Sequence, residues 1–280
     1  MKNKSTELEN FAYVDFEFTC SNKMKEFQDR KHINEIMSVG IGISQKGKLI
    51  DTFYETVKPI YNPKLTSFCK ELTRLTQEEI DKSRGVVEVL CDAFDFVEKY
   101  KVNSLIVFGN QDRENLKREI YWHKKEVDKE VLKKLNKFAS KIQNKQSQIC
   151  QRILKETIII SLNDCKQLLN IPGEIQHNAL SDAIDLSKVD YQSLHKTISE
   201  KSRREYLEKR KEEIRYKQLR RVKDESIICK TNEDKEIREE IKNVVNYLKE
   251  KNSEGDIMEP IKMNAIIDDL LFLVREEDEE

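Results

Sequence analysis

The chain is poor in the residues that interrupt regular structure, with seven glycines and four prolines among 280 residues. This composition argues against a disordered chain and against an all-β fold with many tight turns, and it favours long helices. No apolar run approaches the length that a membrane-spanning helix requires, and no signal sequence opens the chain. We therefore expect a cytoplasmic protein with no membrane partner.

Paired cysteine motifs and an excess of charge of one sign are also absent. The six cysteines include no C-x-x-C pair and no zinc-ligand grouping, which indicates free thiols in a reducing compartment. Charged residues make up 37% of the chain, yet the formal net charge is −1. Since the overall charge says little about nucleic acid, any phosphate-binding surface must come from local clustering.

What the chain does contain is a small set of acids at the edges of apolar segments. The segment Phe11–Phe18 has the aromatic and β-branched composition of a strand, and it carries Asp15 and Glu17. Residues two apart in a strand point to the same face, so these carboxylates lie side by side and repel unless a cation neutralises them. An edge strand with two solvated acids is the alternative interpretation of this motif.

A third acid, Asp112, follows the apolar segment Ser104–Phe108 and the pair Gly109-Asn110. The carboxyl end of a strand in an α/β sheet is where ligands gather. A helix N-terminus also favours an acid through its dipole, so Asp112 alone does not decide between the two interpretations.

A histidine and a fourth acid come later, where His177 precedes a predicted helix and Asp182 lies about one turn inside it. The imidazole can reach a metal-bound water while the carboxylate binds the metal. Such a pair often arises by chance, but the sequence predicts no comparable acidic setting for His32, His123 or His195.

Taken together, these motifs resemble those of the DnaQ-like 3′-to-5′ exonucleases of the DEDDh type. The resemblance lies in their order: D-x-E first, then an Asp that follows a strand and Gly-Asn, then H-x4-D near the end of the domain. The segments Thr56-Val57-Lys58-Pro59 and Leu75-Thr76-Gln77-Glu78 further resemble the KapD/ERI-type branch. The resemblance covers roughly residues 10 to 190. It implies two Mg²⁺ or Mn²⁺ ions, a general base and four carboxylate ligands. These residues are His177 as the base and Asp15, Glu17, Asp112 and Asp182 as the ligands.

The same resemblance implies a substrate, the 3′ end of single-stranded nucleic acid, contacted by Phe18, Thr19 and Asn110. Phe18 stands where the branch usually carries a small residue, which bears on how the terminal base stacks. RNA and DNA both stay open, because the distinction depends on contacts to one 2′-hydroxyl. The alternative is a regulatory protein that binds nucleic acid or a partner, such as an accessory component of a bacterial antiviral system. A pure binding module, however, has no physical need for all four carboxylate ligands together with the histidine base.

The predicted elements favour a ribonuclease-H-like α/β fold, in which helices flank a mixed five-stranded sheet, and the resemblance implies the same. Strands at residues 11–18, 35–44 and 48–58, joined by short connections, predict an antiparallel meander. A helix at residues 86–97, a strand at 104–108, a long helical stretch with Ile142 on its apolar stripe, and a fifth strand at 157–161 follow. Adjacent first and fourth strands would bring the first three acids together.

The composition changes near residue 200, which predicts an exonuclease domain over residues 1–200 and a charged helical extension over residues 201–280. From Lys201 to Arg221 there are ten Lys or Arg and four Glu, which indicates a solvated helix able to contact a phosphate backbone. Apolar stripes at residues 237–248 and 266–274 predict two amphipathic helices. They would pack on the domain, on each other or on a partner chain, and a protein partner or self-association through the extension is therefore expected.

Overall fold

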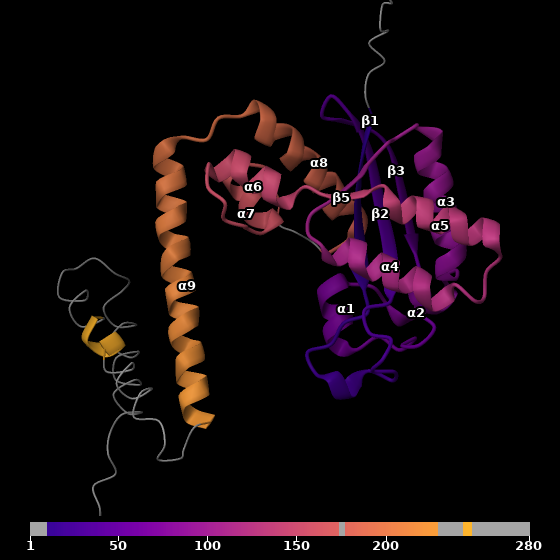
Figure 1. Cartoon of the computed structure of the whole chain (residues 1–280), viewed down its shortest axis with the longest axis horizontal. Helices are drawn as coiled ribbons and strands as arrows, with labels where there is room; N and C mark the ends of the chain where they lie inside the picture. The colour runs from indigo at the N-terminus through magenta and orange to yellow at the C-terminus, as the bar shows by residue number, and fades with distance from the viewer. Residues whose placement is uncertain (1–9, 174–176, 229–242, 248–280) are drawn as a thin grey trace, which may run out of the picture. The chain divides into compact units, whose positions relative to one another are not determined.

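A computed structural model describes residues 10–173, 177–228 and 243–247 of the chain (Figure 1). The chain divides into two units, Met1–Glu200 and Lys201–Glu280. The strands of the first unit are β1 (Asn10–Phe18), β2 (Ile36–Gln45), β3 (Lys48–Thr56), β4 (Leu105–Val107) and β5 (Ile142–Asn144). Its helices are the short 3-10 helix η1 (Met24–Glu26), α1 (Ser67–Thr73), α2 (Gln77–Lys82), α3 (Val86–Lys99), α4 (Gln111–His123), α5 (Lys129–Ser140), α6 (Gln146–Leu154), α7 (Leu162–Leu168) and α8 (Ala179–His195).

The five strands form one mixed sheet in the order β3-β2-β1-β4-β5, with β1 at its centre. β1 and β2 are antiparallel, as are β2 and β3, whereas β4 runs parallel to β1 and β5 parallel to β4. The predicted α/β fold class is confirmed, including the antiparallel meander and the adjacent first and fourth strands.

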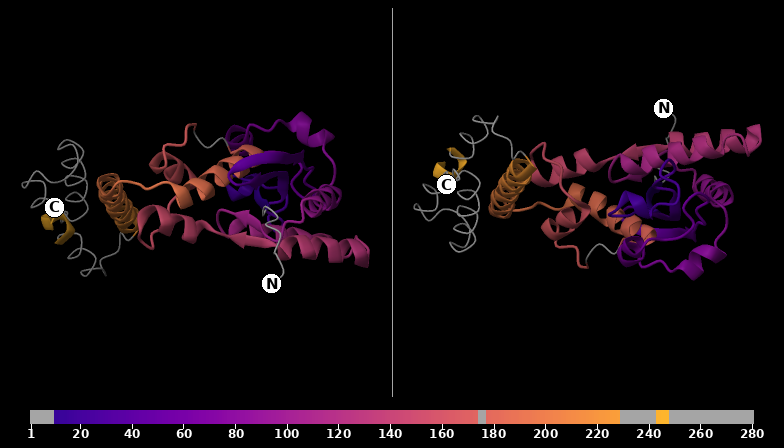
Figure 2. Two further views of the ribbon diagram at one scale, coloured as in Figure 1. Left: turned by 90° about the horizontal axis from the view of Figure 1, so that it is seen from above. Right: turned by 90° about the horizontal axis from the view of Figure 1, so that it is seen from below.

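Alternation along β1 gives the sheet two different faces. Ala12, Val14 and Phe16 enter the main core, which α3, α4 and α5 complete. Tyr13 points to the opposite face, where its hydroxyl donates a 3.0 Å hydrogen bond to Asp190 of α8. The views in Figure 2 show α4 and α5 on one side of the sheet and α8 on the other. Because side chains alternate along a strand, Asp15 and Glu17 share the α8 face with Tyr13.

The prediction of a fifth strand at residues 157–161 is wrong. α6 ends at Lys155 in the left-handed conformation, and Ser161 already begins α7 with a capping box to Asp164. The fifth strand is instead β5, in which Ile142 pairs with Leu105 of β4. Ile142 follows Phe138 by four residues, so its apolar side chain continues the helical period although the backbone has become a strand. The predicted long helical stretch is therefore divided into α5 and α6.

α9 (Glu200–Ile228) is a helix of 29 residues, and all but its first residue belong to the second unit. Lys201 and Glu205 form an ion pair along it, as do Glu208 and Lys211, at the spacing that stabilises a solvated helix. The guanidinium of Arg215 lies 5.1 Å from the ring centre of Tyr247, within the short helical segment 243–247. Most of the stripe predicted at residues 237–248 and all of that at 266–274 lie outside the described residues. The roles predicted for this extension stay predictions.

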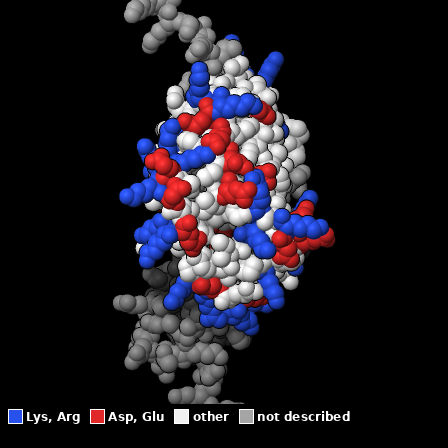
Figure 3. Space-filling model, turned by 90° about the vertical axis from the view of Figure 1, so that its right-hand side faces the viewer, with Lys and Arg blue, Asp and Glu red and all other residues white. Residues whose placement is uncertain are grey.

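Acidic and basic side chains are interspersed over the surface shown in Figure 3, in keeping with a net charge of −1. Of the helices within the described ranges, none is long and apolar enough to cross a membrane. The five cysteines in those ranges are free thiols.

Candidate active site

β1 carries the first two acids of the site. Asp15 lies opposite Gly40 of β2 and Glu17 opposite Ser38, so both stand at the carboxyl end of the central strand. Glu17 is 9% exposed and Asp15 is half-buried. The two carboxylates are thus held on a rigid, hydrogen-bonded element, as predicted.

The third acid belongs to the first turn of α4. The chain leaves β4 through Gly109, whose φ of 131° favours glycine, and enters the helix at Asn110. Asp112 is 8% exposed and buries its carboxylate at the helix N-terminus. Burial raises the pKa of Asp112 to about 7.

The first turn of α8 supplies the fourth acid, Asp182, which is 6% exposed. Asn178 caps this helix by accepting a 3.1 Å hydrogen bond from the backbone N–H of Ser181. His177, just before the cap, is exposed and has a φ of 50°. The ligand atoms of Glu17, His177 and Asp182 all lie within 4.8 Å of one another. Segments 160 residues apart therefore meet at one point.

Gly40 allows α8 to approach the sheet this closely. A Cβ atom at residue 40 would lie 2.2 Å from the backbone of Ala179 and of Leu180, far inside van der Waals contact. Since Gly40 is also the β2 neighbour of Asp15, the start of α8 is pressed against the sheet next to the first acid. Sequence reasoning did not identify this residue, because a glycine in a strand does not disclose what packs on it.

Replacing Gly40 by alanine is expected to lower the free energy of unfolding by about 3 kcal/mol, because backbone must move to accommodate the methyl group. The same shift would separate Asp182 from Asp15 and weaken metal binding. Gly85→Ala is the matched control, since its added Cβ meets no atom within 4 Å. Urea denaturation and Mn²⁺ titration of both variants test this, and equal effects of the two substitutions would contradict it.

The acids share one electrostatic environment. Burial raises the pKa of Asp15 well above its ordinary value, and the charges of Asp112, Glu17 and Asp182 raise it further. Burial, followed by the charge of Asp182, raises the pKa of Glu17 to about 8. Like charges this close favour either bound protons or a bound cation. Clustered carboxylate oxygens with one imidazole suit Mg²⁺ or Mn²⁺, so the donor set fits a divalent metal.

The raised pKa of Glu17 has a consequence for stability. The folded metal-free protein holds a proton on Glu17 that the unfolded chain loses near 4.5, so the associated stability is complete below that pH and disappears as the pH rises through about 8. A bound cation replaces the proton. We therefore expect Mn²⁺ to raise the melting temperature several degrees more at about pH 9 than at about pH 6, relative to EDTA.

Differential scanning fluorimetry across pH measures this difference directly. Glu17→Gln, which cannot titrate, should show a smaller dependence of the Mn²⁺ effect on pH. A Mn²⁺ effect of equal size at both pH values in the unmodified protein would contradict a metal site built on Glu17.

The residues predicted to contact substrate lie around these acids. The half-buried Phe18 packs its ring 6.1 Å from that of Phe16. The Thr19 hydroxyl accepts a 3.0 Å hydrogen bond from the backbone N–H of Glu35. Asn110 accepts a 2.9 Å hydrogen bond from the amide of Asn144. Their contacts with substrate remain predictions.

Glu35 organises the loop beside this region, a role that sequence reasoning missed. Its carboxylate accepts hydrogen bonds from the backbone N–H groups of Ile60, Tyr61 and Asn62, at 2.8, 2.8 and 2.6 Å. Its backbone carbonyl accepts from the N–H of Thr19. In the sequence, the only indication of this role is that Glu35 is an acid at the first position of a predicted apolar strand.

The prediction that no other histidine has an acidic setting is wrong. His123 is buried on α4, where its Nδ1 lies 2.8 Å from Glu126 and its Nε2 lies 3.3 Å from Glu119. Hydrogen bonding to Glu119 raises the pKa of His123 to about 8 despite burial. His32 also pairs with an acid, Asp29, at 2.8 Å. Glu119 lies four residues before His123 on α4, a spacing that favours such a pair on a helix, and Glu126 follows shortly after the helix ends.

Solved structures share this fold. The nuclease domain of 3′hExo, a DEDDh family member bound to rAMP, is 21% identical and superimposes with a TM-score of 0.56 over 70% of this chain and 98% of that chain. Among curated proteins, the probable 3′-5′ exonuclease KapD of Bacillus subtilis is 29% identical over 104 residues, which are 37% of this chain and 49% of KapD. Human 3′-5′ exoribonuclease 1 is 30% identical over 107 residues, 35% of this chain and 29% of that protein.

The fold and the family match over residues 13–189 place the chain in the DnaQ-like exonuclease superfamily, as the sequence predicted. The chain spans about half or less of the length of the curated relatives named above. It belongs to the exonuclease family RNase_T, whose model matches residues 13–189.

Proposed function

We propose that the protein is a metal-dependent 3′-to-5′ exonuclease that removes nucleotides from the ends of single-stranded nucleic acid. The observation that carries this proposal is the meeting of four acids from β1, α4 and α8 beside His177. Family membership over residues 13–189 supports it, because the matched segment contains all five residues.

Asp15, Glu17, Asp112 and Asp182 would hold the metal, Mg²⁺ or Mn²⁺, and we propose two ions with Asp15 shared between them. Bound divalent ions supply charge stabilisation at the scissile phosphate and make an attacking water more acidic. Without a cation, the four carboxylates would repel the phosphate as well as one another. The protein itself contributes a rigid site on β1 and two helix starts.

His177 is the proposed general base. Its ring lies near Glu17 and Asp182 but is exposed, so it can accept a proton from water and pass it to solvent. An imidazole nitrogen can both accept and release a proton, which suits both steps. His177 would thus determine turnover, while the carboxylates determine metal binding.

Phe18, Thr19 and Asn110 are proposed to hold the terminal nucleotide. Thr19 is fixed by its hydrogen bonds to Glu35, which would give the adjoining backbone a constant position. Phe18 offers a half-buried ring on which a base can stack. One of the relatives is an exoribonuclease, and the experiment below determines whether this chain prefers RNA or DNA.

The test is a time course with 5′-labelled single-stranded RNA and DNA of the same sequence, in Mg²⁺, Mn²⁺ or EDTA. We expect both metals to support a ladder that shortens from the 3′ end and EDTA to prevent it. Comparison of the two strands gives the sugar preference. No shortening of either strand with any metal would contradict the proposal and leave a binding role for the fold.

A further inference from the structure

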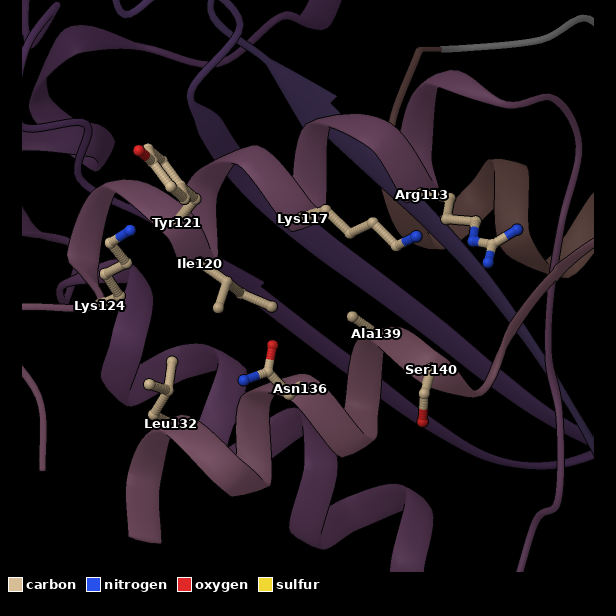
Figure 4. Close-up of a pocket in the computed structure, with 9 residues that line it drawn as sticks. All are labelled: Arg113, Lys117, Ile120, Tyr121, Lys124, Leu132, Asn136, Ala139 and Ser140. Carbon is tan, nitrogen blue, oxygen red and sulfur yellow. The ribbon is translucent and has the colours of Figure 1, made fainter. Parts of the chain in front are cut away.

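A groove with a volume of about 460 Å³ runs between α4 and α5 (Figure 4). Three cations line it, Arg113 and Lys117 of α4 and Lys124 directly after it. Figure 4 shows Arg113 and Lys117 directed along the side of the groove that faces the end of α5. Its floor includes apolar side chains such as Ile120 and Leu132. No acid is among the nine residues that line this groove.

The cations of α4 differ from those on the neighbouring helix. On α5 and just after it, Lys134 pairs with Asp95, and Lys137 and Lys141 both pair with Glu98, at 2.6 to 2.7 Å. Within the part of the chain that the structure describes, Arg113, Lys117 and Lys124 form no ion pair with an acid. The positive charge of the groove is therefore not neutralised locally, although the chain as a whole is nearly neutral.

The groove begins next to the acid cluster. Arg113 directly follows Asp112, Lys117 lies four residues further along the helix, and Lys124, eleven residues after Arg113, follows its last residue in helical conformation. At 1.5 Å per residue, the three cations span about 16 Å, the length of a few nucleotides of a strand. A strand whose 3′ end reaches Asp112 would have this line of charge within reach of its preceding phosphates.

Other groups in the groove suit the bases rather than the phosphates. Tyr121 is 62% exposed, and the ammonium of Lys124 lies 3.7 Å from its ring centre. Asn136 and Ser140 add groups that can donate and accept hydrogen bonds. A cationic groove with an exposed aromatic ring and uncharged polar groups is the combination that binds single strands without sequence preference.

We propose that this α4–α5 groove binds the part of the single strand that lies on the 5′ side of the terminal nucleotide. The proposal rests on the proposed exonuclease function, since it is the 3′ end at the acid cluster that directs the strand along α4. It makes affinity dependent on strand length, because a strand of one or two nucleotides reaches the acid cluster without extending along the groove.

The test compares oligo(U) and oligo(dT) of about 2 and about 20 nucleotides, by fluorescence anisotropy of the full-length protein at several salt concentrations, with Ca²⁺ present as a divalent cation for the carboxylates. Replacing Arg113, Lys117 and Lys124 together by glutamate should reduce the preference for the longer strand at least about fivefold. Loss of three phosphate contacts should also make the negative slope of log K against log salt shallower by about 2.

A matched charge reversal at Lys46, Lys48 and Lys101 is the control. These exposed residues lie at the end of the sheet where β1 begins, away from Glu17. The control should keep both the length preference and the salt slope. Thermal melting of both triple variants verifies that each is folded.

Three results would overturn the groove proposal. They are equal affinity of the unmodified protein for short and long strands, equal losses for both strands in the groove variant, and equal effects of groove and control variants. Hydrolysis of the same strands in Mn²⁺ is measured separately. Absence of hydrolysis together with the expected length preference would reject the exonuclease function and support the groove as a strand-binding surface.

Discussion

Replacing Asp15 by asparagine is expected to abolish turnover, with a loss of at least about 10³-fold in kcat, while the protein stays folded. Asp15 is the carboxylate on which the charges of all three other acids act, which places it at the centre of the cluster. An amide keeps the shape of the side chain but removes the charge that a shared metal ligand needs. Gel-based hydrolysis assays with Mg²⁺ and Mn²⁺ measure the loss.

The same substitution should leave the metal-free protein as stable as before or more stable. The raised pKa of Asp15 means that its ionised form opposes folding at neutral pH, so removal of the charge relieves repulsion. The increase in melting temperature on addition of Mn²⁺ should disappear. Asp95→Asn, at an exposed ion pair on α3, is the control and should keep both activity and the Mn²⁺ effect. Turnover retained by Asp15→Asn at ordinary metal concentration would rule out Asp15 as a shared ligand.

Replacing His177 by alanine is expected to lower kcat by about 10²- to 10⁴-fold while the affinity for Mn²⁺ changes little. The alanine cannot accept the proton of the attacking water, but the four carboxylates remain. Parallel calorimetric titration with Mn²⁺ separates the two effects.

His195→Ala is the matched control, because this exposed histidine lies in the last turn of α8 rather than before the first. The ring of His177 is near enough to Glu17 and Asp182 to act as a ligand instead. A large loss of Mn²⁺ affinity in His177→Ala would assign it that role. Unchanged turnover would remove it from the reaction.

The acids could be predicted from sequence because each lies within or at the edge of an apolar segment. Asp15 and Glu17 occupy alternate positions of a strand whose remaining residues demand burial, so their common face followed from the period of two. Asp112 and Asp182 each lie in the first turn of a helix that the apolar spacing had already placed. That the acids come together in space follows from the order of the strands in the sheet, and the predicted fold class specifies that order.

The parts that could not be predicted depend on contacts between distant segments. Ile142 fits a helical period as well as it fits β5, and its pairing with Leu105 determines which one forms. The need for a glycine at residue 40 arises only from the backbone at the start of α8, which packs directly against it. Glu35 was visible as a strand residue, but the three backbone N–H groups that it binds lie in a loop 25 to 27 residues away.

The position of α8 in the chain has a consequence for synthesis. A polypeptide emerging from the ribosome presents Asp15, Glu17 and Asp112 long before residue 182, and the backbone that covers Gly40 belongs to the same helix, α8, as Asp182. Until then the nascent sheet holds three of its four carboxylates. The fourth proposed ligand and the packing over Gly40 are added together, so the proposed metal site can be complete only after α8 has been synthesised.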